Sequence, residues 1–325
     1  MIGDSGPAAR TAERYQEFAR EAHGRSAAYE ALAEAVSGDG AVLGFLGTLP
    51  EAKRQPNLLF AAARYLLGSS ADISALRGLI ARDAARLAEV MLARRTQTNE
   101  PARCATLLPA LSLALAGRGG SLALIEVGAS AGLTLLFDRY SYDFGGRIIR
   151  GSDPQAPVLR CAVRGPVPVP AAIPEIAWRG GLDLNPLDVT SGDDMHWLSC
   201  LLWPGEGDRE QRLACAVAAA RRDPPPVFRG DLTTDLPALA ARAPAGATLV
   251  VYHSAVLAYV TAEDRARFAD TVRGLGAVWL SNEGPGVVPG VSLPAREGAP
   301  FVLIRDGSTP LALTDPHGTW VDWLE

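Results

Sequence analysis

The sequence predicts an α/β protein in which an all-helical N-terminal domain precedes a mostly parallel sheet. Two observations predict this fold class. Residues 1–117 are rich in Ala, Leu, Arg and Glu, which favour helices, and contain no segment of alternating polarity. After Gly120, short apolar segments alternate with helical ones, and such strands pair in parallel through right-handed crossovers. We therefore expect a helical cap domain at 1–117 and a sheet domain at 118–325.

The individual elements follow in chain order. Gly117 to Gly120 form a turn, residues 122–127 (LALIEV) the first strand, and residues 133–140 the helix after it. The proline-rich segment 140–175 is predicted to be an insertion with edge strands. The remaining strands are expected at 176–184, 227–228, 248–253, 277–281, 301–305 and 311–314, and the remaining helices at 193–203, 209–222 and 263–275.

Composition excludes several classes of protein. The chain has 325 residues, 48% hydrophobic and 21% charged, as in ordinary globular proteins. Its net charge of −5 opposes an anionic polymer, so no nucleic-acid partner is expected. None of the four cysteines lies in a CxxC pair, so we expect reduced thiols and no metal site. There is no apolar signal region and no apolar run long enough for a bilayer, which predicts a cytoplasmic protein without a membrane partner.

A glycine-rich loop follows the first strand and carries the main functional signal. It runs Glu126-Val-Gly128-Ala-Ser130-Ala-Gly132. Small residues at a strand-to-helix turn let a ligand approach the backbone and the unpaired N–H groups of the helix. A dinucleotide site would have G-x-G-x-x-G, but Ser130 stands at the second glycine position and Gly132 comes one residue early. The loop therefore suits a ligand without a pyrophosphate.

The acidic residue two positions before the first glycine resembles the opening motif of class I S-adenosylmethionine-dependent methyltransferases, which have a Rossmann-type sheet. The resemblance covers about the last 200 residues and implies S-adenosylmethionine as cofactor. Carried over position by position, it implies that the cofactor is bound by Glu126, Gly128, Ser130, Gly132, Asp183, Asn185, Asp231 and Leu232. Asp183 ends the second strand, where one carboxylate accepts from both ribose hydroxyls, and Asp231 follows the third strand, near the adenine. The C-terminal hairpin resembles the last two strands of that family.

One departure is the length of chain between the two acids. In dinucleotide folds the second acid comes about 20 residues after the glycines. Asp183 therefore fits the ribose position only if the insertion at 140–175 is looped out of the sheet. The whole chain also resembles a bacterial family of uncharacterised function, through Gln55-Pro-Asn-Leu-Leu59, Gln97-Thr-Asn-Glu100, Arg103-Cys104, Glu126 to Leu133, Asp183-Leu-Asn-Pro186, Trp203-Pro204, His253 to Leu257 and Asp315-Pro-His-Gly318.

Polar residues near the predicted strand ends are candidates for chemistry. We expect methyl transfer to a small molecule bound between the two domains, near the carboxyl ends of the strands. His253, Glu100 or Glu283 would take the proton from the acceptor. The expected substrate-binding residues are Asn99, Arg103, Ser254, Tyr259 and Asn282. These candidates also have structural explanations. His253 would bond to a loop carbonyl, residues 97–103 would form a helix cap, and Asn282 and Glu283 would form a turn after the fifth strand.

Two other functions compete with methyl transfer. Gly128-Ala-Ser130-Ala-Gly132 also fits the G-x-S-x-G elbow of α/β-hydrolases, and Asp183, Asp231 and His317 follow in the order of that catalytic triad. Against it, the elbow strand here is the first of its sheet, and no His-Gly-Gly oxyanion loop precedes it. The other alternative is a nucleotide-binding sensor without catalysis.

Overall fold

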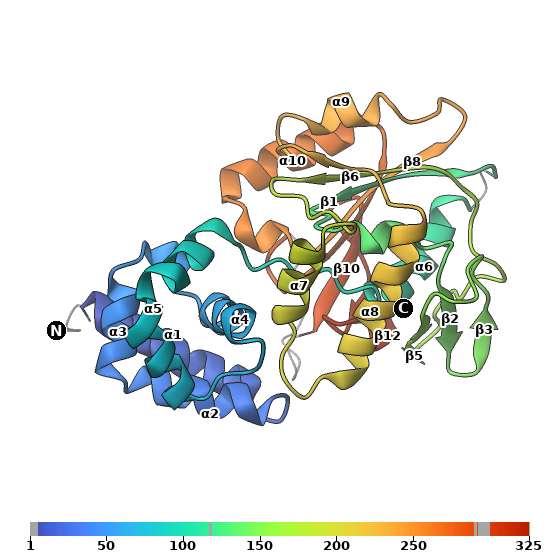
Figure 1. Cartoon of the computed structure of the whole chain (residues 1–325). Coiled ribbons are helices and arrows are strands. Elements are labelled where there is room, and N and C mark those ends of the chain that lie inside the picture. The colour runs from blue at the N-terminus through green and yellow to red at the C-terminus, as the bar shows by residue number, and fades with distance from the viewer. Residues whose placement is uncertain (1–5, 117–118, 289–290, 292–299, 325) are drawn as a thin grey trace. The chain divides into compact units, whose positions relative to one another are not determined.

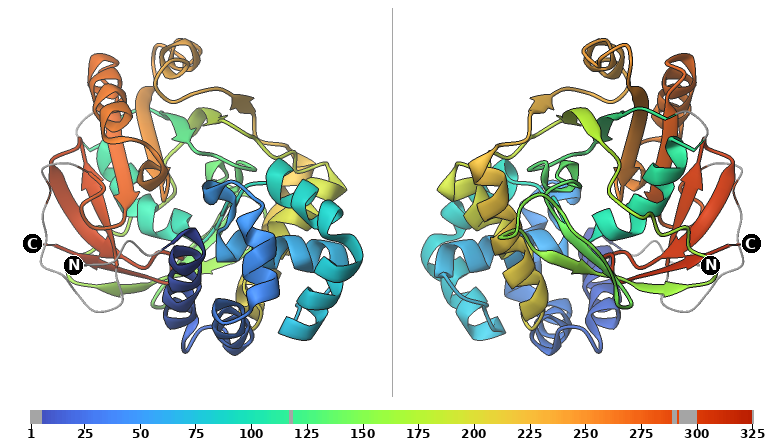
Figure 2. Two further views of the ribbon diagram at one scale, coloured as in Figure 1. Left: turned by 90° about the vertical axis from the view of Figure 1, so that its left-hand side faces the viewer. Right: turned by 90° about the vertical axis from the view of Figure 1, so that its right-hand side faces the viewer.

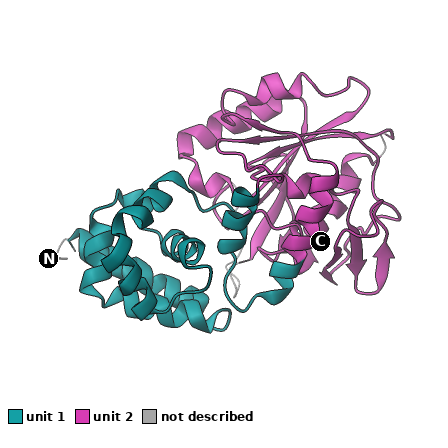
Figure 3. Cartoon of the chain, viewed as in Figure 1, with its two compact units in different colours: residues 1–98, 192–211 teal, residues 99–191, 212–325 magenta. Residues whose placement is uncertain are grey.

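The chain forms two compact units. The structure is a computed structural model that describes residues 6–116, 119–288, 291 and 300–324. Unit 1 consists of Met1–Thr98 and Gly192–Gln211, and unit 2 of Asn99–Ser191 and Arg212–Glu325 (Figure 3). The units thus divide at Thr98 rather than at the expected 117, and part of the predicted turn there lies outside the described residues. The difference arises because α6 (Arg103–Ala114) packs on the strands of unit 2.

Unit 1 is helical throughout its described residues, as the composition predicts. Its elements are α1 (Pro7–Ala22), α2 (Ala27–Ser37), α3 (Gly40–Gly47), η1 (Glu51–Lys53), α4 (Pro56–Leu67), α5 (Ile73–Ala93) and α7 (Gly192–Cys200), shown mainly in blue in Figure 1. Three of these helices begin at side-chain caps: Ser26, Asp39 and Asp72 accept hydrogen bonds from backbone N–H groups of the first turn. The N-terminal boundaries are therefore encoded locally.

The segment 192–211 joins unit 1 through polar contacts as well as packing. α7 packs on α4. Arg94 at the end of α5 pairs with Asp193, and its Nη1 lies 3.0 Å from Oδ1 of Asp194. The indole N–H of Trp203 donates to Oδ1 of Asn57 at 2.9 Å. The motifs around Asn57 and Trp203, 146 residues apart, thus meet in one structural contact.

Asn57→Ala should destabilise unit 1. Trp203 is buried, so the substitution leaves its indole N–H without an acceptor, which costs about 1–3 kcal/mol. Thermal unfolding followed by tryptophan fluorescence measures the loss. Asn57→Asp keeps an acceptor oxygen and should lose much less. Equal losses in the two variants would show that the hydrogen bond does not matter.

Unit 2 is built on a nine-stranded, mostly parallel sheet (Figure 1). Its order is β5-β12-β11-β10-β9-β8-β1-β6-β7. The strands are β1 (Leu122–Val127), β5 (Ala162–Arg164), β6 (Ile176–Asp183), β7 (Val227–Arg229), β8 (Thr248–Ser254), β9 (Val278–Glu283), β10 (Phe301–Arg305), β11 (Thr309–Thr314) and β12 (Trp320–Trp323). The five strands from β7 to β9 are parallel, whereas β10, β11 and β12 follow one another antiparallel. The expected α/β class is confirmed, and the sheet is mixed.

The segment 140–175 lies outside the parallel part of the sheet. It forms β2 (Ser141–Phe144), β3 (Arg147–Ile149) and β4 (Val158–Arg160), which make a separate sheet in the order β3-β2-β4. β5 from the same segment pairs with β12 at the far edge of the large sheet. β6 can therefore pair directly with β1, with Glu126 opposite Gly181. The insertion is looped out, as the position of Asp183 requires.

Helices cover both faces of the sheet. α9 (Leu236–Ala240) and α10 (Ala262–Gly274) bury Leu236 and Phe268 against the face that carries Val251 and Trp279 (Figure 2). α6 packs against β8 and β9. α8 (Gly207–Arg222) begins in unit 1 and continues into unit 2, because the units divide after Gln211. β1 and β9 are buried at every residue, which explains the apolar run that opens each strand. No helix in the described part of the chain is both long and apolar enough to cross a bilayer.

The helix predicted at 133–140 is wrong. Only the 3-10 turn η2 (Leu133–Leu135) forms there. Side chains bind backbone groups of this segment: Oδ1 of Asn99 accepts from the N–H of Leu133 at 2.8 Å. The hydroxyl of Tyr140 donates to the carbonyl of Leu133, and that of Tyr252 to the carbonyl of Thr134. Tertiary hydrogen bonds thus override the helical propensity of this segment.

Candidate functional site

Polar side chains form a row across the carboxyl ends of the strands of unit 2, on one face of the sheet. The register places Glu126 of β1 beside Gly181 of β6 and Tyr252 of β8. Side chains alternate between faces, so Asp183 shares the face of Gly181. Ser254 lies opposite Asn282 of β9 on this face. Four neighbouring strands therefore contribute to the row, in an otherwise apolar interior.

The glycine loop is sharply turned but closely packed by the protein itself. Gly128, Ser130 and Gly132 have φ values of +71°, +52° and +72°. A Cβ on Gly128 would lie 2.3 Å from Cγ2 of Val256, and one on Gly132 would lie 2.8 Å from Pro225. Both glycines are thus needed for their backbone conformation and for close approach of other segments. The sequence pattern alone attributed this close approach to a ligand.

Asp183 lies directly against the glycine loop. Its Oδ2 accepts from the N–H of Ser130 at 2.8 Å, and its Oδ1 accepts from the N–H of Asn185 at 2.7 Å. Asp183 is half-buried. Two residues of the expected cofactor set, Asp183 and Ser130, are therefore in contact.

Glu126 is a buried carboxyl group at the base of the loop. Its Oε1 accepts a hydrogen bond from the hydroxyl of Thr134, and its Oε2 has no hydrogen-bond partner among the described residues. Burial raises the pKa of Glu126 to about 8, although the bond from Thr134 and the positive charge of Arg103 lower it. The group is mostly protonated at neutral pH, and one of its oxygens is free to bind.

The segment from Asn99 to Arg103 lies over the row. The side chain of Asn99 binds η2, as described above, and its Nδ2 lies 3.5 Å from Oγ1 of Thr134. The guanidinium of Arg103 donates to the carbonyls of Pro316 at 2.8 Å and Ser254 at 3.1 Å. Oε1 of Glu100 accepts from Nε of Arg212 at 2.7 Å. All three predicted residues are buried at the site, with a structural partner for each.

His253 and Glu283, two of the expected bases, bind each other instead. Nδ1 of His253 lies 2.7 Å from Oε1 of Glu283, and Nε2 accepts from the indole N–H of Trp279 at 3.0 Å. Both side chains are essentially without solvent exposure. Burial alone would raise the pKa of Glu283, but the bond from His253 and two backbone donors outweigh it, so that pKa is lowered. This geometry does not support His253 or Glu283 as a base that contacts substrate.

The other predicted residues divide into two groups. Nδ2 of Asn282 donates to Oγ of Ser254 at 3.2 Å, and its Oδ1 accepts from Thr314 at 2.7 Å, which adds β11 to the row. Tyr259, in η3 (Leu257–Tyr259), is 77% exposed and lies outside this buried network. Sequence reasoning missed Thr134 and Thr314, because single threonines give no motif.

Asp231 and Leu232 follow β7, next to the end of β6. The N–H of Gly230 donates to the carbonyl of Asp183 at 2.9 Å, which brings the two strand ends together. Oδ1 of Asp231 accepts from the N–H and the hydroxyl of Thr233. Leu232 packs at the edge of the core that includes Leu236. Both residues lie at the expected edge of the sheet, where Asp231 stabilises its own turn.

Ser130 has the strained backbone of a nucleophile but not its partners. Its hydroxyl is buried and has no hydrogen-bond partner among the described residues. Asp183, one of the acids expected in the hydrolase triad, binds the N–H of Ser130. His317, the expected histidine, lies in the turn after β11, where its N–H donates to Oδ2 of Asp315 at 3.0 Å. The hydrogen bond from the serine hydroxyl to a histidine that a triad requires is therefore not formed among the described residues.

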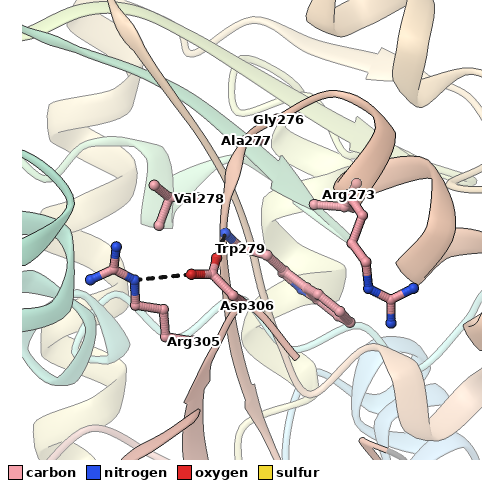
Figure 4. A pocket seen from close by; sticks show the side chains of 8 residues that line it. Arg273, Gly276, Ala277, Val278, Trp279, Arg305 and Asp306 are labelled. Carbon is pink, nitrogen blue, oxygen red and sulfur yellow. Dashed lines mark hydrogen bonds and ion pairs between the residues drawn. The ribbon is translucent and has the colours of Figure 1, made fainter. Parts of the chain in front are cut away.

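A shallow hollow of about 250 Å³ lies elsewhere, at the amino end of β9 (Figure 4). It is lined by Trp279, Arg273 and the Arg305–Asp306 pair, whose side chains are 3.1 Å apart. Because β9 runs from Val278 to Glu283, this hollow lies at the opposite end of the strand from the polar row. It is separate from the candidate site.

Comparison with known proteins identifies a family. A search of the curated proteins finds no match to the chain, and a search of the solved structures finds none either. A family model described as an uncharacterized protein conserved in bacteria, DUF2332, matches residues 12–323. The match spans both units and every residue of the polar row. The chain therefore belongs to this family of uncharacterised bacterial proteins.

Proposed function

We propose that unit 2 binds S-adenosylmethionine and transfers its methyl group to a small molecule. The observation that carries the proposal is the position of Asp183. It comes 53 residues after Ser130 in the chain, yet its carboxylate binds the backbone of the glycine loop. A half-buried carboxylate beside a glycine loop is the group that a ribose diol requires, because its oxygens accept from both hydroxyls.

The order of the parallel strands supports a nucleoside ligand at this position. β1, β6 and β7 follow one another in one direction, and β8 and β9 continue on the other side of β1. The order therefore reverses between β1 and β8. Open α/β sheets bind their ligands in the crevice outside the carboxyl ends of the strands at such a point.

The residues present fit the cofactor in charge and chemistry. Asp183 would hold the ribose, Asp231 and Leu232 would lie toward the base, and Glu126 has an unpartnered buried oxygen at the base of the glycine loop. When bound, the cofactor supplies an activated methyl group on a sulfonium. The protein would mainly align the acceptor and exclude water. Since His253 and Glu283 are paired, proton removal is not assigned to them.

Calorimetry with S-adenosylmethionine and S-adenosylhomocysteine tests the proposal. We expect the wild-type protein to bind both, and Asp183→Ala to lose at least tenfold in affinity because the ribose acceptor is gone. Asp188→Ala is the matched control, an exposed aspartate in the same loop region whose Oδ1 accepts from the N–H of Thr190 at 2.8 Å. Absence of binding to either ligand by the wild type at millimolar concentration would overturn the proposal.

Acyl hydrolysis through Ser130 is the second candidate, and one observation favours it. The φ of +52° at Ser130 is the kind of strained turn on which nucleophilic serines sit. Labelling by a fluorophosphonate that disappears in Ser130→Ala would support hydrolysis. An unlabelled wild type would remove this candidate. Ligand binding without turnover on a broad panel of acceptors would instead favour a sensor.

A further inference from the structure

The hollow at the amino end of β9 combines an apolar wall with a charged one (Figure 4). The apolar wall is formed by Val272, Ala277, Val278 and Trp279. The charged wall is formed by Arg273, Arg305 and Asp306. The volume of about 250 Å³ lies below the roughly 300–1,000 Å³ of sites that hold drug-sized molecules. The hollow therefore suits a small ligand with one charged end and one apolar end.

Arg305 is held at the rim of the hollow by Asp306. Nε of Arg305 donates to Oδ2 of Asp306 at 3.1 Å, and Oδ1 of the same carboxylate accepts from the N–H of Trp279 at 3.0 Å. The N–H of Asp306 donates in turn to the carbonyl of Trp279 at 2.8 Å. The carboxylate that orients the guanidinium is thus anchored to the backbone of β9. Arg305 is therefore oriented without a ligand, which lowers the entropy that binding costs.

The outer part of the Arg305 guanidinium is the group that a ligand would contact. The bond to Asp306 uses Nε, and neither Nη1 nor Nη2 bonds to another residue in the described part of the chain. The side chain is 32% exposed, against 61% for Arg273, whose partner Asp270 is itself exposed. The two guanidinium groups point away from each other in Figure 4. One arginine is therefore assigned to the ligand, and its planar pair of Nη groups matches the two oxygens of a carboxylate.

The surroundings of the hollow favour a ligand with one negative charge over one with two. Asp270 and Asp306 already place carboxylates beside the two arginines. α10 ends at Gly274, next to the hollow, and the carboxyl end of a helix carries a partial negative charge. A phosphate dianion would be repelled by all of these groups, whereas a carboxylate brings a single charge. The apolar wall can then cover a short alkyl chain.

We propose that this hollow is a second ligand site, which binds a small aliphatic monocarboxylate with its carboxylate on Arg305 and its alkyl chain against the apolar wall. The inference is independent of the proposed function, because no residue of the polar row lines the hollow. Trp279 is the connection between the two places. It lines the hollow, and its indole N–H donates to Nε2 of His253 at 3.0 Å. The signal of this indole N–H is therefore a local reporter of binding.

Calorimetry with acetate, propionate, butyrate and valerate tests the site. Affinity should rise with each CH₂ group, by up to about fourfold, until the hollow is filled. Butyl phosphate, which has the same chain and a second charge, should bind more weakly than butyrate. No binding of any of these acids at tens of millimolar, an affinity that does not depend on chain length, or tighter binding of butyl phosphate would each overturn the inference.

A pair of arginine variants tests the charged wall. Arg305→Gln should lose at least tenfold in affinity for butyrate, because the charged pair of donors is gone. Arg267→Gln is the matched control: Arg267 is an exposed arginine of α10 that pairs with Asp264 and does not line the hollow. This variant should bind butyrate as the wild type does. Equal losses in the two variants, or no loss in Arg305→Gln, would contradict the assignment of the carboxylate to Arg305.

Nuclear magnetic resonance of the tryptophan side chains shows where the acid binds. The chain has six tryptophans, and the indole signal of Trp279 is the one that disappears in Trp279→Phe. Butyrate should shift this signal in the wild type and not in Arg305→Gln. Binding that moves other tryptophan signals and leaves that of Trp279 in place would locate the acid elsewhere and refute the proposal. Neither result bears on the binding of S-adenosylmethionine, which is measured separately.

Discussion

Glu126→Gln should remove a loss of stability that the wild-type protein undergoes as the pH rises from about 5 to about 8. Burial keeps Glu126 protonated in the native state, with its pKa raised from 4.5 to about 8. In the unfolded chain the same group ionises near 4.5. Between pH 4.5 and about 8 the native state holds a proton that the unfolded chain has lost. The contribution of Glu126 to the free energy of unfolding is therefore fully present below pH 4.5, decreases through this range, and is lost once the pH has risen through about 8. The slope is about 1.4 kcal/mol per pH unit at most.

Denaturant unfolding at pH 5, 6, 7 and 8 measures the effect. Glutamine resembles the protonated glutamic acid in size and polarity, so the variant should fold and show a flatter profile. Glu175→Gln, on an exposed side chain of the same unit, should follow the wild-type profile. Parallel profiles for the wild type and Glu126→Gln would mean that Glu126 is ionised in the folded protein.

The strands of unit 2 were predictable because their signal is local. β1 and β8 are continuous apolar runs bounded by polar or glycine residues, as buried parallel strands are. β12 was missed, and β5 was expected only as one of the edge strands of 140–175 without a partner, since it has three residues, all exposed, and pairs with a strand far along the chain. Pairing of this kind depends on the completed sheet and leaves no pattern in a short segment.

The unit boundary and the helix at 133–140 were not predictable for a related reason. α6 has the same helical composition as α5, but its Arg103 and Cys104 bind groups of unit 2. No α-helix forms at Leu133 and Thr134, because their backbone groups form hydrogen bonds with the side chains of Asn99, Tyr140 and Tyr252. In both places contacts between residues distant in sequence decide the outcome, and propensity is only a weak guide.

The candidate residues lie at the strand ends where the sequence predicts them, whereas their partners differ from the expected ones. Asp183 and Ser130 lie in contact, as a glycine loop followed by an acid at the next strand end implies. His253 and Glu283 lie at the expected strand ends, but 30 residues separate them in the chain, and the sequence does not show that they bind each other. A polar residue at a strand end marks where a site lies, whereas its partners decide whether it is free to react.

Gly318→Ala should be strongly destabilising, because both its conformation and its surroundings exclude a side chain. Gly318 has a φ of +82°, and a Cβ there would lie 2.3 Å from the carbonyl carbon and oxygen of Ala102. These are backbone atoms at the start of α6, so a rotamer change cannot relieve the clash. We expect about 2–5 kcal/mol, from left-handed strain of about 1–2 and overpacking of about 1–3.

Gly276→Ala separates the two contributions. Gly276 has a φ of +63° with nothing within 4 Å of its Cβ position, so it should lose only the part due to strain. The difference between the two variants in unfolding free energy then measures the close contact at Ala102. That contact holds the turn 315–318 against the start of α6, where Arg103 donates to the carbonyl of Pro316. If the two variants lose equal stability, the turn does not anchor α6, and Arg103 must be placed over the row by its bond to Ser254 instead.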